Sequence, residues 1–160
     1  MRRLICFSSL AAALFITTAA TAARAFWPPW LSIESPVNPA DRSARDAVFL
    51  VHAETHNGPS TIAALSGSAE GLVSGKRRSV SLKIDDTGRP GVFAVRKQWP
   101  SEGIWLVRVS LESTTALVSL APDGSVAAVR IPTTMAEGRP IPRAVVARDI
   151  DSTLMAASGR

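Results

Sequence analysis

The sequence has 160 residues, with 18 lysines and arginines, 13 acidic residues and a formal net charge of +5. This length suits one domain that can bury a sizeable core. The one cysteine, Cys6, lies in the N-terminal segment, which excludes a disulfide scaffold or a thiolate metal site for the remainder of the chain.

The first 25 residues have the pattern of an export signal. Met1-Arg2-Arg3 is a basic start, residues 4–20 are apolar and rich in alanine, and Ala23-Arg24-Ala25 is a small-x-small cleavage site. The longest strictly apolar run, residues 10–16, is far shorter than the roughly 20 residues of a membrane span. We therefore expect residues 1–25 to be a cleaved signal peptide. The mature chain is then exported, periplasmic or secreted, with no membrane span.

Removal of this signal also changes the charge of the protein. Arg2, Arg3 and Arg24 leave with it, which lowers the number of basic residues from 18 to 15 against 13 acidic ones. The resulting net charge of +2 is too small to argue for nucleic acid as a partner, so we expect none.

The mature chain begins with a segment rich in tryptophan and proline. Over 26–39, four prolines remove backbone donors, which predicts an extended N-terminal arm with one short strand at 30–35. The rest divides into a β-sandwich domain over 40–132 and a C-terminal tail over 133–160, which holds a short helix at 149–157.

Seven further strands are predicted from short apolar runs and from alternation of apolar and polar residues. The clearest pattern places Trp105, Val107, Val109 and Leu111 on one face, so we expect Trp105, and likewise Trp99, in the core. Short strands at regular spacing predict an all-β, immunoglobulin-like antiparallel sandwich of about seven to eight strands. The predicted strands cover 47–54, 61–67, 79–84, 91–99, 104–111, 115–120 and 126–131.

A family resemblance rests on Gly91-Val92-Phe93 and on the run Gln98-Trp99-Pro100-Ser101-Glu102-Gly103-Ile104-Trp105. It resembles the unit of an aromatic strand followed by a Pro-x-x-Gly-x-Trp strand in exported bacterial immunoglobulin-like domains, such as the YtkA-like, FixH-like and CopC-like families. The resemblance implies a sandwich of seven or eight strands. Some members of these families bind copper through histidine and methionine, which makes a metal site a hypothesis to test.

His52, Glu54 and His56 form the one constellation with metal-binding chemistry. Alternate residues of a strand share a face, and two imidazoles with a carboxylate can hold copper or zinc. Asn57 begins a turn signal directly after them, which favours the simpler interpretation that His56 lies in a turn and His52 is a half-buried strand residue. We therefore expect no cofactor, with copper or zinc as the alternative.

Two further groups are candidates for partner binding. Trp27 and Trp30 would form an adhesive arm if they were exposed, although large aromatics favour folding back to plug one end of the sandwich. Lys76-Arg77-Arg78 could bind an anionic partner, although three charges favour a solvated loop.

The sequence contains no serine-nucleophile motif of the Gly-x-Ser-x-Gly or Ser-x-x-Lys type and no zinc-protease motif, so we expect no enzyme. The function predicted is that of an exported, non-catalytic binding or accessory module of the cell envelope. Its partner would be an envelope protein or a small ligand at a loop end. The alternative is a small periplasmic metal-binding protein that uses His52 and His56.

Overall fold

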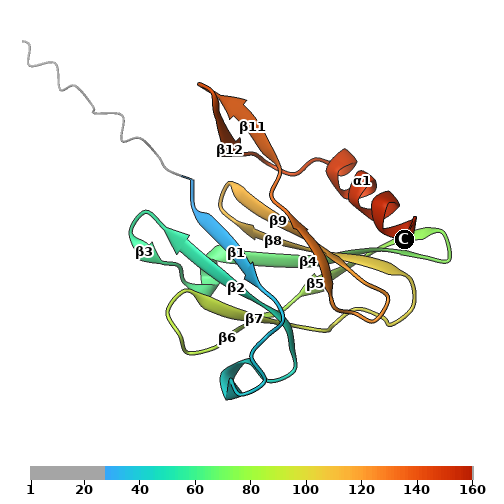
Figure 1. Cartoon of the computed structure of the whole chain (residues 1–160), viewed down its shortest axis with the longest axis horizontal. Helices are drawn as coiled ribbons and strands as arrows, with labels where there is room; N and C mark the ends of the chain where they lie inside the picture. The colour runs from blue at the N-terminus through green and yellow to red at the C-terminus, as the bar shows by residue number, and fades with distance from the viewer. Residues whose placement is uncertain (1–27, 160) are drawn as a thin grey trace, which may run out of the picture.

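Two antiparallel sheets pack face to face in the computed structural model, which describes residues 28–159 (Figure 1). The first sheet, sheet A, has the order β1-β2-β7-β6, with the short β3 paired to β2. Its strands are β1 (Trp30–Glu34), β2 (Ala47–Thr55), β3 (Gly58–Pro59), β6 (Ile84–Asp86) and β7 (Val92–Arg96).

The second sheet, sheet B, has the order β10-β9-β8-β4-β5. Its strands are β4 (Leu65–Val73), β5 (Lys76–Leu82), β8 (Ile104–Leu111), β9 (Thr114–Leu120) and β10 (Val126–Arg130). After β10 come a two-stranded hairpin, β11 (Thr133–Ala136) and β12 (Arg139–Pro142), and the helix α1 (Ala147–Ser158). Two single 3-10 turns, Arg42–Ala44 and Ile62–Ala64, complete the described elements.

The core lies between the sheets and follows the period of two in the strands. Trp105, Val107, Val109 and Leu111 of β8 all point inward, as the alternation predicts. They meet the inward side chains of sheet A, among which are Phe49, Val51, Ala53, Phe93 and Val95.

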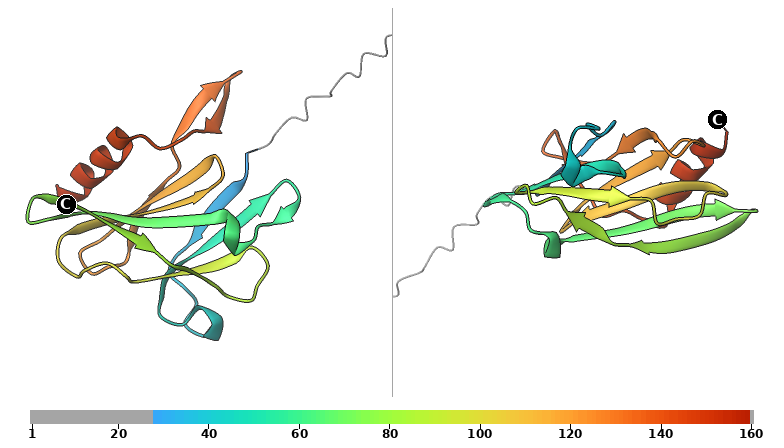
Figure 2. Two further views of the ribbon diagram at one scale, coloured as in Figure 1. Left: turned by 180° about the vertical axis from the view of Figure 1, so that it is seen from behind. Right: turned by 90° about the horizontal axis from the view of Figure 1, so that it is seen from below.

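A second apolar layer lies on the outer face of sheet B. Leu106 of β8 and Leu117 of β9 point away from the main core, and Ile150 and Leu154 of α1 cover them. The views of Figures 1 and 2 show the helix lying across this sheet. With 12 residues, α1 is too short to cross a membrane, and no helix of residues 28–159 has the length and apolarity to do so.

The pairing of the strands defines two ends of the sandwich. One end, the Trp30 end, holds Trp30 opposite Glu54, together with the start of β9, where Thr114 Oγ1 donates a hydrogen bond of 2.7 Å to the carbonyl of Pro29. The opposite end, the loop end, holds the β7–β8 connection 97–103 and the β9–β10 connection 121–125.

The predicted all-β sandwich with a short C-terminal helix is confirmed. The segment 26–39 supplies β1, an edge strand of sheet A, and the tail 133–160 supplies a hairpin besides the predicted helix. The strand predicted at 61–67 lies further along the chain, because residues 62–64 form a 3-10 turn and β4 begins at Leu65 and extends to Val73.

Candidate functional site

The predicted metal residues do not converge. His52 lies on the outer face of sheet A, where its Nε2 is hydrogen-bonded at 2.7 Å to the Glu34 carboxylate of the neighbouring strand β1. Glu54 is exposed on the same strand, and His56 lies exposed in the two-residue turn between β2 and β3. Across the described residues 28–159, no three histidine, cysteine or acidic side chains are grouped so that they could hold a metal ion.

The turn after β2 explains this separation. Thr55 pairs with Gly58, so the chain reverses at His56 and Asn57 and the second imidazole no longer follows the strand. Glu34, the residue that His52 does meet, is 18 positions away in sequence. Only the register of β1 against β2 brings the two together, and the sequence pattern did not identify it.

Trp30 is exposed, and the expectation that it plugs the sandwich was wrong. It retains 68 % of its accessible surface, whereas Trp99 and Trp105 retain 5 % and 4 %. The reason is its position: Leu31 and Ile33 of β1 face the core, so the alternation turns Trp30 outward on an edge strand, next to Glu54. Trp27 lies outside the described residues.

The basic triplet is part of a strand, and the expectation of a solvated loop was wrong. Lys76, Arg77 and Arg78 begin β5, directly after the Ser74–Gly75 turn of the β4–β5 hairpin. The Arg77 guanidinium forms an ion pair with Asp151 of α1, and its Nη2 is 3.9 Å from Glu70 Oε2. Arg77 therefore bridges sheet B and the helix at the surface, and all three basic residues are exposed.

Within residues 28–159, three of the other exposed large apolar side chains belong to the segment that links sheet B to α1, and the remaining two, Val129 and Met155, lie on β10 and on α1. In the β11–β12 hairpin, Met135 retains 67 % of its accessible surface, and Ile141 is also exposed. Figure 1 shows this hairpin projecting from the body of the sandwich, on the side of the Trp30 end. Val146, just before α1, is exposed as well.

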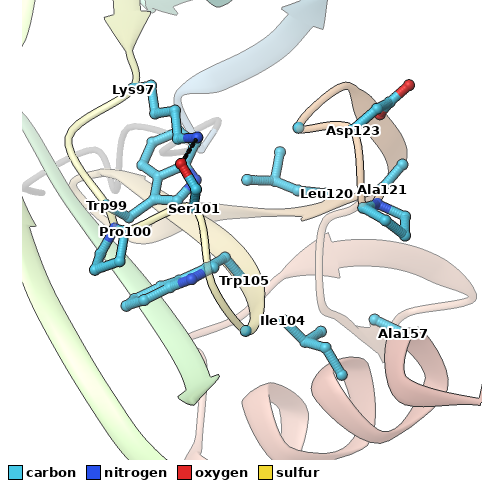
Figure 3. A pocket seen from close by; sticks show the side chains of 13 residues that line it. Lys97, Trp99, Pro100, Ser101, Ile104, Trp105, Leu120, Ala121, Asp123 and Ala157 are labelled. Atoms are coloured by element: carbon cyan, nitrogen blue, oxygen red, sulfur yellow. Dashed lines mark hydrogen bonds between the residues drawn. The ribbon is translucent and has the colours of Figure 1, made fainter. Parts of the chain in front are cut away.

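A cavity of about 200 Å³ opens at the loop end, and the sequence pattern did not reveal it. Figure 3 shows the indoles of Trp99 and Trp105 on one side and Leu120 with the β9–β10 loop on the other. Ala157, near the end of α1, contributes to the border. Trp99 and Trp105 were predicted as core residues, and their burial is confirmed, yet their outer edges also form this wall.

The comparisons with known proteins provide no relative for this chain: no protein-family model, no curated protein and no solved structure matches it.

Proposed function

We propose that the protein is an exported, non-catalytic binding module that docks another protein of the cell envelope through its Trp30 end. The export signal pattern of residues 1–25 supports the location. The observation that carries the binding function is the exposure of Trp30, at 68 % of its accessible surface.

An exposed tryptophan is a strong interface signal. Its ring offers a large apolar area at a low cost in conformational entropy, and tryptophan is enriched among the residues that dominate binding energy. Glu54, directly across the strand pair, supplies a polar neighbour at the rim of such a contact.

The β11–β12 hairpin gives a second support for a contact at this end. An isolated two-stranded hairpin is marginally stable in water, because its side chains have little to pack against. Met135 and Ile141 are exposed on this hairpin. A partner that covers them would bury apolar area and order the hairpin at the same time.

The test is site-specific photocrosslinking in cells that export the protein. A photoreactive residue in place of Glu54 should yield a defined adduct with one envelope protein, and the same residue in place of Lys76, at the far end of the sandwich, should not. Trp30→Ser in the Glu54-labelled protein should abolish the adduct. This surface change should leave the free energy of unfolding within about 0.5 kcal/mol of the original value.

Two results would contradict the proposal. One is an adduct from the photoreactive residue at position 54 that persists in the Trp30→Ser variant. The other is the same adduct, in equal yield, from the photoreactive residue at position 76. Tight, stoichiometric copper or zinc binding that is lost in the His52→Ala/His56→Ala double variant would instead support the alternative of a metal-binding protein.

A further inference from the structure

The cavity at the loop end is built by three segments that are distant in sequence. They are the β7–β8 connection, the β9–β10 connection and the last turn of α1. Its volume of about 200 Å³ is below the roughly 300 Å³ at which pockets for drug-sized ligands begin, so it suits a small molecule. The cavity lies at the opposite end from Trp30, so it is independent of the proposed docking surface.

The body of the cavity is apolar and aromatic. Trp99 and Trp105 provide two indoles, and Leu120 and Ile104 add aliphatic surface. Such walls favour an aromatic ligand, because offset-stacked or edge-to-face contacts between rings add to the free energy gained by burying apolar area.

Trp99 brings an unused hydrogen-bond donor to this space. Trp105 Nε1 donates to the Glu102 carbonyl at 2.8 Å, but within the described part of the chain Trp99 Nε1 has no acceptor. Within the same part, every buried side-chain nitrogen or oxygen has a hydrogen-bond partner. Trp99 Nε1 is therefore not fully enclosed, although 95 % of the residue is covered, and the cavity is the open space that Trp99 lines.

The charged group on the same side of the cavity is also a donor. Lys97 Nζ donates to Ser101 Oγ at 2.8 Å, which uses one of its three protons and keeps the ammonium at the border of the cavity (Figure 3). Asp123, across the cavity, is already engaged, since Oδ1 accepts hydrogen bonds from the amide and the hydroxyl of Ser125. These bonds lower the pKa of Asp123. The Asp123 carboxylate keeps its negative charge, with Oδ1 bonded within its own loop. The side-chain donors free for a ligand are Lys97 Nζ, which is cationic, and Trp99 Nε1.

We propose that this cavity binds a small aromatic carboxylate, with the ring between the two indoles and Leu120 and the carboxylate on Lys97 Nζ and Trp99 Nε1. A carboxylate accepts hydrogen bonds from both groups, and a charge-assisted bond is stronger than a neutral one. A neutral amide of the same shape keeps the ring contacts but loses the charge.

The experiment uses phenylacetate as the probe and the indole N–H signals in a nitrogen–proton NMR titration as the readout. Phenylacetate should shift the Trp99 signal in a saturable way and leave the Trp30 signal unchanged. Phenylacetamide should bind about tenfold more weakly. Lys97→Met should weaken phenylacetate binding about tenfold, and Lys76→Met, a matched exposed lysine on β5, should not change it.

The Trp99→Phe variant distinguishes the contribution of the Nε1 donor to binding from that of the aromatic ring. The variant keeps an aromatic wall and removes Nε1, so phenylacetate should bind several-fold more weakly. Because the Trp99 signal is lost, binding to this variant is measured from the Trp105 indole signal. The Trp30→Ser variant should bind phenylacetate normally, so that failure of the docking proposal and failure of this one are distinguishable.

Three results would overturn the proposal. The first is no shift of the Trp99 signal at about 10 mM phenylacetate, a concentration above the Kd of even a millimolar binder. The second is equal affinity for the carboxylate and the amide. The third is an equal effect of Lys97→Met and Lys76→Met.

Discussion

At the scale of single residues, Trp105 packs closely over the backbone of β4. Gly71 lies directly opposite Trp105 in the register of β4 and β8. A Cβ at Gly71 would be 2.5 Å from Trp105 Cε3, closer than any real contact. The indole therefore occupies the space that a side chain would take, which explains a glycine in the interior of a strand.

Gly71→Ala should lower the free energy of unfolding by about 1–3 kcal/mol, because the methyl group forces the buried indole to shift. Gly67→Ala on the same strand is the matched control: the nearest atom to its Cβ would be Ile84 Cδ1, at 3.2 Å, the end of a flexible side chain, and the next nearest lie at 3.4 Å. Gly67→Ala should lower the free energy of unfolding by less than about 1 kcal/mol. Urea unfolding followed by tryptophan fluorescence measures both variants, and an equal loss of unfolding free energy in the two would contradict the packing described for Trp105.

The residue scale also shows where sequence reasoning succeeded and failed with tryptophan. Trp105 was placed in the core correctly because it alternates with apolar residues on β8. Trp30 lies on a strand too short and too close to prolines to show alternation, so the general tendency of aromatics to be buried gave the wrong answer. The face of an edge strand depends on its register, which the sequence does not display.

At the scale of elements, charge fixes the start of α1 to the segment that precedes it, in addition to the apolar contacts of the helix with sheet B. The Asp149 carboxylate accepts two hydrogen bonds of 2.7 Å from Arg143 and one of 2.9 Å from the amide of Val146, at the start of the helix. These bonds hold the pKa of Asp149 well below its usual range. Burial alone would favour the neutral carboxyl, but these hydrogen bonds outweigh it, so the folded protein holds Asp149 in its ionised form.

Asp149→Asn should therefore destabilise the protein most at neutral pH. A carboxyl whose pKa is lowered by folding contributes its stability above its unfolded pKa, about 4, and loses it as the pH falls below that value. The difference in unfolding free energy between the variant and the original protein should shrink between pH 7 and pH 2. Denaturant unfolding at a series of pH values, followed by far-UV circular dichroism, measures it.

Asp151→Asn is the control for this experiment, since Asp151 also pairs with an arginine of the chain but is half exposed. Exposed ion pairs contribute little, so its effect should be the smaller of the two at pH 7. A difference for Asp149→Asn that does not change with pH would show that the carboxylate charge is not what holds the helix start.

Strands with a regular apolar face were predicted well, and strands without one were not. The bounds of β8 were predicted as observed, whereas β4 was found only at its start. Glycines at two positions and a glutamate interrupt the apolar pattern of β4. Lys76-Arg77-Arg78 were assigned to a solvated loop because three charges are too few for a binding patch, but they begin β5, an exposed edge strand next to the hairpin turn, where charge is tolerated. The β11–β12 hairpin contains Pro140 and Pro142, which argue against a strand.

At the scale of the whole molecule, the loop-end cavity shows what sequence reasoning could not assemble. The tryptophans at 99 and 105 were each predicted to lie in the core. Their convergence depends on how the β7–β8 and β9–β10 connections meet at one end of the sandwich. No local pattern encodes that meeting, because the segments are joined only through the pairing of complete strands.

The exported protein should begin at Phe26. The small-x-small pattern of Ala23-Arg24-Ala25 places the signal-peptidase cut directly before it. Intact mass spectrometry of the protein recovered from the periplasm or the medium measures the start. An exported species that still carries Met1 would contradict both the cleavage site and the argument for location that rests on it.

The short edge strand β1 also sets the way in which this protein meets other chains. Pro29 precedes it and Pro36 follows it closely, so the unpaired edge offers only a few residues of backbone for a foreign strand to continue the sheet. This arrangement discourages edge-to-edge polymerisation at high local concentration, even with a large aromatic ring beside the edge. The docking proposed for the Trp30 end would therefore be made side chain to side chain, which favours a reversible complex of fixed stoichiometry over growth into fibres.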